Sequence, residues 1–234
     1  MIMKKLLITC EHASCDIPKE YLTLFRPFTR VLQTHKGWDI GALEIYNALI
    51  EAFPQSYQQR ACWSRLLIDL NRSLNHKNLF SGITKSLSKA AQQDIIRAYY
   101  EPYRRLFLTN FIKRLNSEKQ VVHIAVHSFT PILNGKKRIA DIGILYDPAR
   151  PAEVKLARAW RLALQAEMPT CRIRMNYPYW GKTDGFCTAI RKQYSNEQYI
   201  GIELETNQAL FKSAKMTFRL KEVLVRSLQA ALRP

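Results

Sequence analysis

The sequence VVHIAVHSFTP, residues 121–131, begins with a mostly apolar run, which is followed by His127 and then by small and polar residues. Nearly all of its first residues are apolar, which predicts a strand buried on both faces, as in a parallel sheet covered by helices. Ligands of such sheets bind beyond the carboxyl ends of the strands. We therefore expect His127 to lie at a functional site.

The same pattern occurs near the start of the chain. The apolar run KKLLITC, residues 4–10, is followed at once by Glu11 and His12. Two histidines at the ends of two strands predict a shared metal ion. The alternative is that each histidine only closes its strand through hydrogen bonds, and the residues leave both interpretations open.

The composition is that of a folded protein with a large positive charge. Of 234 residues, 47% are apolar and 24% are charged, which argues against disorder and fits one domain over residues 1–234. Lys and Arg number 36 against 19 Asp and Glu, giving a net charge of +17. The surplus predicts attraction to anions, with nucleic acid, anionic lipid and a small dicarboxylate all compatible.

The five cysteines are odd in number and scattered, so neither a disulfide framework nor a cysteine zinc site is predicted. This composition favours the reducing cytoplasm. The apolar run near the start is too short for a signal peptide, and no stretch is long enough to span a membrane.

Further periodic segments extend the α/β pattern. Apolar runs predict strands over residues 64–72, 141–146 and 171–175, and an alternating pattern predicts one over residues 199–205. Helical spacing predicts helices over residues 40–53, 90–114, 152–167 and 211–232. Residues 14–36 are interrupted by prolines, which predicts a loop with one short helix.

Asp39 stands directly before the predicted helix over residues 40–53. One interpretation is an N-cap, in which the side chain accepts backbone N–H groups. The other is a metal ligand, or a residue that orients one. Both remain open from the sequence.

The segment SRLLIDLNR, residues 64–72, carries Arg65, Asp69, Asn71 and Arg72 in a short space. Arg65 and Asp69 could form an ion pair while Asn71 caps a turn. Alternatively, Arg72 and Arg65 bind a carboxylate, because a guanidinium offers two parallel donors. The position of Arg72 at a predicted strand end favours the second role for it.

Later segments add a carboxylate and an aromatic loop. Glu203 lies among apolar residues in YIGIELE, where a carboxylate is costly unless paired and where a raised pKa would suit a general base. Arg138 precedes the strand over residues 141–146 and is a candidate anion contact. The loop NYPYWG, with Asn176 and Tyr177, is suited either to lining a pocket or to a rigid surface turn.

Taken in order, the segments CEHAS, THKGWDIGA, SRLLIDLNR, HSFTP, GKKR before DIGILY, NYPY and IGIEL resemble the N-formylglutamate amidohydrolase family over residues 6–210. That family is similar to the zinc carboxypeptidases and aspartoacylase. The resemblance implies a three-layer αβα fold of the phosphorylase/hydrolase-like type, with a mixed, mostly parallel sheet and one zinc ion.

The resemblance also implies roles for particular residues. His12 and His127 would be zinc ligands, Arg72 after Asn71 would hold the substrate carboxylate, and Glu203 would be the general base. The HxxE motif of the relatives is missing, because Cys15 stands three residues after His12. The carboxylate ligand is then Asp39 or, as a second candidate, Glu11.

A second departure concerns the last segment. Glu205 stands two residues after Glu203, where the family tends to have an arginine. This departure bears on the identity of the substrate more than on the zinc chemistry.

We therefore expect a zinc-dependent hydrolase acting on a small, anionic N-acyl amino acid such as N-formylglutamate, with Arg65 or Arg138 stabilising the oxyanion and Asn176 and Tyr177 contacting substrate. Nitrogen and oxygen ligands would also accept other divalent ions.

Two alternatives remain. One is a non-catalytic basic module for nucleic acid or another polyanion, based on the charge and on a basic face of the last helix. The other is a Cys187 or Cys10 nucleophile with a histidine base.

Overall fold

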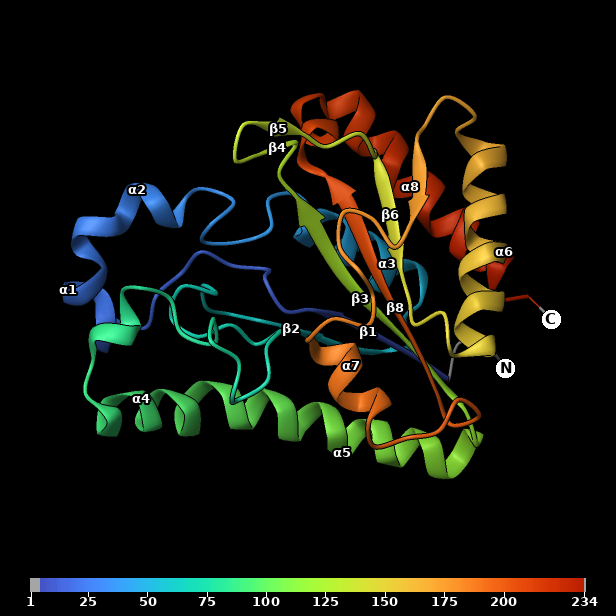
Figure 1. The fold of residues 1–234 in the computed structure, drawn as a ribbon. Coiled ribbons are helices and arrows are strands. Elements are labelled where there is room, and N and C mark those ends of the chain that lie inside the picture. The colour runs from blue at the N-terminus through green and yellow to red at the C-terminus, as the bar shows by residue number, and fades with distance from the viewer. Residues whose placement is uncertain (1–4, 234) are drawn as a thin grey trace.

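The computed structural model describes residues 5–233, and their centre is a six-stranded mixed sheet with the strand order β2-β1-β3-β8-β6-β7 (Figure 1). Four strands are mutually parallel: β1 (Leu6–Cys10), β2 (Tyr57–Arg60), β3 (Val121–Phe129) and β8 (Tyr199–Asn207). The strand β6 (Ile142–Leu145) is antiparallel to β8 and parallel to β7 (Ile173–Met175). The expected mixed, mostly parallel sheet is confirmed.

The two central strands are buried along their whole lengths, as the apolar run predicted. Alternate residues nevertheless face different surroundings. Ile124, Val126, Ile202 and Leu204 belong to an apolar core on one face of the sheet. Because successive side chains of a strand alternate between faces, His127, Glu203 and their neighbours at every second position lie on the other face.

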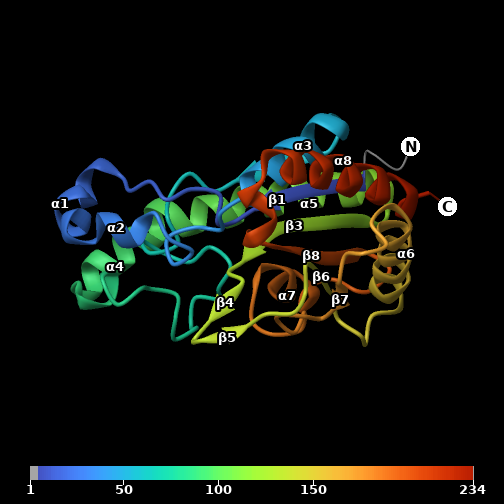
Figure 2. The ribbon, with the colours of Figure 1, turned by 90° about the horizontal axis from the view of Figure 1, so that it is seen from above.

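Helices cover both faces and complete the three layers. The apolar core packs against α3 (Ala42–Ala52), α6 (Pro151–Glu167) and α8 (Ala214–Ala231). A second core lies under α5 (Glu101–Glu118) and α7 (Phe186–Arg191), and includes Phe107 and Phe111. Figure 2 shows α3 and α8 along one side of the sheet and α7 on the other.

The predicted helix over residues 90–114 is present as one long rod at the edge of the molecule (Figure 1). It consists of α4 (Lys89–Ile95), a π-helical turn (Ile96–Tyr100) and α5. Pro102 lies in the first turn of α5, where a missing N–H is tolerated most easily. The wider π-helical turn directly precedes the turn that contains Pro102, and the helical rod continues past the proline.

The remaining elements are short. Residues 14–36 hold more helical turns than the one predicted: Lys19–Tyr21, α1 (Leu22–Phe25), Arg26–Phe28 and α2 (Thr29–Leu32). A further 3-10 turn spans Thr84–Ser86, and a hairpin pairs β4 (Ile132–Leu133) with β5 (Lys136–Lys137). Before α8, the turn Gln208–Lys212 ends at Ser213, whose hydroxyl accepts the N–H of Met216 and so caps the helix.

The predicted strand over residues 64–72 is wrong. These residues form consecutive turns instead, in which the Ser64 hydroxyl accepts the N–H of Leu66 and the Asp69 carboxylate accepts the N–H of Asn71. Such local side-chain bonds compete with strand pairing. The strand β2 and the helix α7 were not predicted from the sequence.

Within residues 5–233, no helix is both long and apolar enough to cross a membrane.

Candidate active site

The site lies where the parallel strands end. Glu11 and His12 directly follow β1, and His127 is close to the end of β3. Because β1 and β3 are neighbours and run in the same direction, their carboxyl ends meet at one edge of the sheet. The rings of His12 and His127 lie 5.1 Å apart between centroids. The predicted meeting of the two histidines is confirmed.

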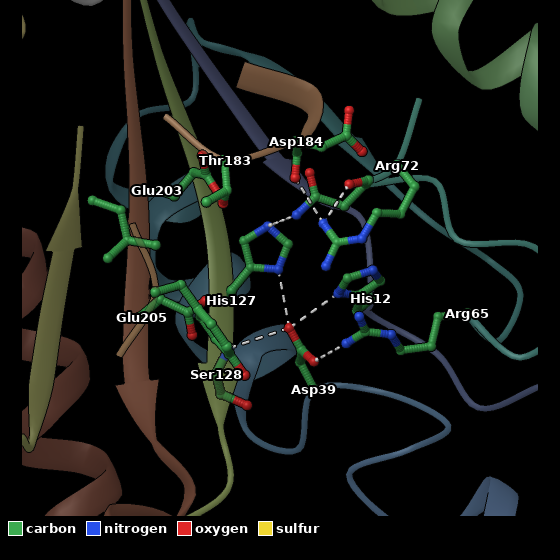
Figure 3. Close-up of a pocket in the computed structure, with 13 residues that line it drawn as sticks. His12, Asp39, Arg65, Arg72, His127, Ser128, Thr183, Asp184, Glu203 and Glu205 are labelled. Carbon is green, nitrogen blue, oxygen red and sulfur yellow. Dashed lines mark hydrogen bonds and ion pairs between the residues drawn. The ribbon is translucent and has the colours of Figure 1, made fainter. Parts of the chain in front are cut away.

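Asp39 joins the two histidines. Its Oδ2 lies 3.2 Å from Nδ1 of His12 and 3.0 Å from Nδ1 of His127 (Figure 3). All three side chains are buried, and their nearest ligand atoms lie within 4.8 Å of one another. The N-cap interpretation of Asp39 is wrong, because α3 begins after Gly41 and its cap residue makes no side-chain cap bond.

The other ring nitrogen of each histidine faces a second carboxylate. His12 Nε2 lies 2.7 Å from Asp69 Oδ1, and His127 Nε2 lies 3.2 Å from Glu11 Oε2. If each Nε2 donates its proton outward to these carboxylates, both Nδ1 lone pairs point at the Asp39 carboxylate. Carboxylates that orient histidines in this way are a common feature of metal sites. The donor set therefore fits a divalent cation.

The pKa values of the cluster reflect the several carboxylates that surround the two histidines. Burial alone would raise the pKa of Glu11, but the close contact with the His127 imidazole lowers it to about 2. Burial alone would lower the pKa of His127, but its hydrogen bond to Asp39 and its contact with Glu11 raise it well above the ordinary value. The cluster thus holds its carboxylates ionised and favours a positive charge between them.

Arg65 fixes the position of two of these carboxylates. Its NH1 donates to Asp39 Oδ1 over 3.1 Å and its NH2 donates to Asp69 Oδ2 over 3.0 Å. The expected ion pair with Asp69 is confirmed. Asp69 was not predicted to contact His12, because the sequence separation of 57 residues gives no sign of that contact.

A cavity of about 110 Å³ opens beside the cluster. Its wall includes seven of the residues predicted from the sequence: His12, Asp39, Arg65, Asn71, Arg72, His127 and Glu203. It also includes Tyr179, from the loop NYPYWG, and three residues that were not predicted to belong to the site: Thr183, Asp184 and Glu205. The spacing of Glu203 and Glu205 could have indicated Glu205, because residues two apart on a strand share a face.

Arg72 and Asn71 come from the turns that replace the predicted strand. Arg72 NH1 donates to the carbonyl oxygens of Asn71 and Asp184, at 3.0 and 2.9 Å. Its Nε is buried and has no hydrogen-bond partner among residues 5–233. Asn71 Oδ1 accepts the N–H of Phe186, which ties this loop to the start of α7.

Three other predicted residues lie outside the cavity wall within the described part of the chain. Arg138 is buried and donates to the Tyr179 hydroxyl over 3.1 Å, so it contacts the wall only through that tyrosine. The Asn176 side chain accepts the N–H groups of Tyr146 and Gly181. The Tyr177 hydroxyl accepts the N–H of Ile139.

Two carboxyl groups of β8 face the cavity. Glu203 and Glu205 are 8% and 5% exposed, and burial is the main cause that raises both pKa values, that of Glu205 from 4.5 to about 8. Figure 3 shows both on the β8 side of His127, with Arg65 and Arg72 on the other side. A raised pKa is what the general-base hypothesis for Glu203 requires.

The pKa of Glu205 predicts how stability depends on pH in the metal-free protein. Between pH 4.5 and 8 an unfolded chain ionises this carboxyl while the folded chain keeps it protonated, so the free energy of unfolding falls by about 1.4 kcal/mol per pH unit from this group. Glu205→Gln removes the effect. Its melting temperature should exceed that of the unaltered protein increasingly from pH 5 to pH 8, as thermal unfolding in a chelator would show.

The control for this prediction is Glu197→Gln, at an exposed position before β8. It should shift the melting temperature equally little at pH 5 and pH 8. A Glu205→Gln curve parallel to that of the unaltered protein would contradict the prediction.

The two buried cysteines proposed as nucleophiles are inaccessible. Cys10 and Cys187 are each 0% exposed, and burial raises both thiol pKa values well above the ordinary value. Cys187 Sγ does lie 3.7 Å from Nδ1 of His123, but that histidine is itself fully buried. Because the thiolate is the nucleophile, this geometry does not favour cysteine catalysis.

Fold and site together define a three-layer αβα protein with a candidate metal centre at the carboxyl ends of its parallel strands. The chain belongs to the N-formylglutamate amidohydrolase family, whose model matches residues 4–212. Membership of this family identifies the chain as an amide hydrolase, and the resemblance seen in the sequence is confirmed.

Two solved structures are similar to this chain. The gene product Atu2144 from Agrobacterium tumefaciens is 28% identical, with a TM-score of 0.83 over 97% of this chain and 90% of that one. An N-formylglutamate amidohydrolase from Ralstonia eutropha JMP134 is 16% identical, with a TM-score of 0.70 over 96% of this chain and 93% of that one. At this identity the second likeness shows the fold alone. A comparison with curated proteins gave no match.

Proposed function

We propose that this protein hydrolyses the amide bond of a small N-acyl amino acid, such as N-formylglutamate, with a zinc ion held by His12, Asp39 and His127. The observation that carries the proposal is the convergence of two Nδ1 atoms on one buried carboxylate beside a cavity. Family membership indicates the reaction class, and the nitrogen and oxygen donors of the cluster suit a divalent ion such as zinc.

Zinc, when bound, would polarise the substrate carbonyl and lower the pKa of water, which is the chemistry that amide hydrolysis at neutral pH needs. Asp69 and Glu11 would hold the two histidine rings in the ligating tautomer through the contacts at Nε2. Other divalent ions remain compatible with this nitrogen and oxygen set.

Glu203 is proposed as the general base. It would accept a proton from the attacking water and return it to the departing nitrogen, so one carboxyl acts first as base and then as acid. Burial in the cavity wall raises its pKa, which makes it a stronger base towards the attacking water than an ordinary carboxylate.

Arg72 is proposed to bind the substrate carboxylate, because it lines the cavity and a guanidinium offers parallel donors to a carboxylate. Asn71 lies beside it in the wall. Arg65 would stabilise negative charge that develops on the carbonyl oxygen. The proposed roles of Arg138, Asn176 and Tyr177 are less direct, since each contacts other protein groups rather than the cavity.

The alternative of a basic module for nucleic acid or another polyanion explains the net charge of +17. It gives no role to a buried cluster of histidines and carboxylates. Strong salt dependence of polyanion binding, without any need for metal, would favour it. We also propose a cytoplasmic location, because unpaired cysteines suit a reducing compartment.

Elemental analysis and a substrate panel test the proposal. The purified protein should contain about one zinc ion per chain, and should release amino acid from at least one N-formyl amino acid in a chelator-sensitive manner. A protein that binds no metal even after zinc is supplied, and hydrolyses no member of the panel, would refute the proposal.

A further inference from the structure

Glu205 is a cavity residue that the proposed mechanism does not use. It is 5% exposed, and its Oε2 is buried without a hydrogen-bond partner among residues 5–233. Leaving a buried acceptor unsatisfied is costly, and more so when it is charged. Such a group in a native protein calls for an explanation, which can be strain, a catalytic role, or a water or ion that satisfies it.

We propose that Glu205 binds an ammonium or guanidinium group of the substrate, so that the protein acts on N-acyl derivatives of a basic amino acid. This inference rests on the proposed amide hydrolysis and names its substrate class.

The charges around Glu205 favour a cationic partner. Glu203 lies two positions away on the same strand. Beside burial, the charges of Asp39 and Glu203 raise the pKa of Glu205, while those of His127 and Arg65 lower it. The two terminal nitrogens of Arg65 already donate to Asp39 and Asp69. A cation bound beside Glu205 would lower its pKa and hold the carboxylate ionised, whereas a substrate carboxylate placed here would find no positive partner in this group.

The other side of the cavity has the opposite preference. Arg72 lies across His127 from Glu205 (Figure 3), and its guanidinium lines the cavity and can donate to an anion. A substrate with a carboxylate at one end and a cation at the other would satisfy both groups. An N-acyl amino acid with a basic side chain has this arrangement, and its scissile amide lies between the two charges.

The size of the cavity limits the substrate. Its volume of about 110 Å³ is well below the 300–1,000 Å³ typical of drug-sized ligand sites. A single acylated amino acid with a short acyl group fits this limit better than a peptide does.

The experiment compares kcat/KM of the zinc-loaded protein for N-formyl-lysine, N-formyl-arginine, N-formylglutamate and N-formyl-leucine. We expect the basic substrates to exceed the other two by tenfold or more, since one buried charge pair contributes roughly 1.5–3 kcal/mol. Glu205→Gln should lower kcat/KM for the basic substrates about tenfold and leave N-formyl-leucine nearly unchanged. Glu205→Arg should shift the preference towards N-formylglutamate, and Glu197→Gln should change nothing.

The outcomes separate this inference from the proposed function. A preference of the unaltered protein for N-formylglutamate would overturn the subsite and leave amide hydrolysis in place. If no substrate is hydrolysed, calorimetric titration with lysine and with glutamate decides. Lysine binding that is lost in Glu205→Gln would support the subsite while hydrolysis fails, and the absence of lysine binding would overturn it.

Discussion

Replacing Glu203 with glutamine is expected to lower kcat by about 10²- to 10⁴-fold, the range for loss of a general base. Glutamine keeps the shape of the side chain but cannot accept the proton from water. The zinc content should stay unchanged, because Glu203 is not part of the His12, Asp39 and His127 cluster. Steady-state hydrolysis of the best N-formyl substrate, with elemental analysis of the same samples, measures both effects.

The pH profile gives a second measure of the same role. A base must be ionised to act, and the raised pKa of Glu203 means that its ionised fraction begins to fall at a higher pH than that of an ordinary carboxylate. The rate should therefore decline on the acid side of neutrality, and this limb should vanish in the residual activity of Glu203→Gln. Glu222→Gln, at an exposed position of α8, is the matched control. Turnover retained in Glu203→Gln would remove this residue as the base.

Replacing His127 with alanine is expected to abolish zinc binding and to lower kcat/KM by about 10³-fold or more. A catalytic metal stabilises the charge of the transition state by several kcal/mol, and each loss of about 1.4 kcal/mol lowers the rate about tenfold. The loss of the imidazole also leaves the buried Glu11 and Asp39 carboxylates with one partner fewer. Metal content and activity should therefore fall together.

Two further variants separate loss of metal from loss of folding. Asp39→Asn preserves the side-chain shape and should also lose zinc, because the amide is a weaker ligand than the carboxylate. His76→Ala, in the loop after Arg72, removes a histidine outside the cluster and should retain full zinc content. Circular dichroism of all three would confirm that they fold. Zinc retained in His127→Ala would exclude this histidine as a ligand.

The sheet was predictable where burial on both faces leaves a clear pattern. The central strand β3 was predicted from a nearly continuous apolar run and the start of β8 from an alternating pattern, and both lie buried in the middle of the sheet. The strand β2 was missed because its sequence, YQQR, is polar and lies at the edge of the sheet. The short helix α7 was missed because its six residues are too few to show a helical period.

The error over residues 64–72 has a different cause. The apolar residues Leu67, Ile68 and Leu70 are buried, as the residues of a central strand would be. They pack under the long helical rod, however, and not in the sheet. Burial alone does not distinguish a strand from a coiled segment beneath a helix. The polar residues between them, Ser64 and Asp69, fold the backbone into turns.

Patterns within a few residues predicted a buried sheet covered by helices and the two strand-end histidines, and the family resemblance implied the three layers. The pairing of Arg65 with Asp69 was one of two interpretations that the residues left open. Three findings came only from the tertiary structure: Asp39 bridges both histidines, Asp69 and Glu11 face their outer nitrogens, and Glu205 shares the cavity with Glu203. These contacts join segments that are far apart in the chain. Local propensity carries no information about them, since they exist only once parallel strands bring their carboxyl ends to one edge of the sheet.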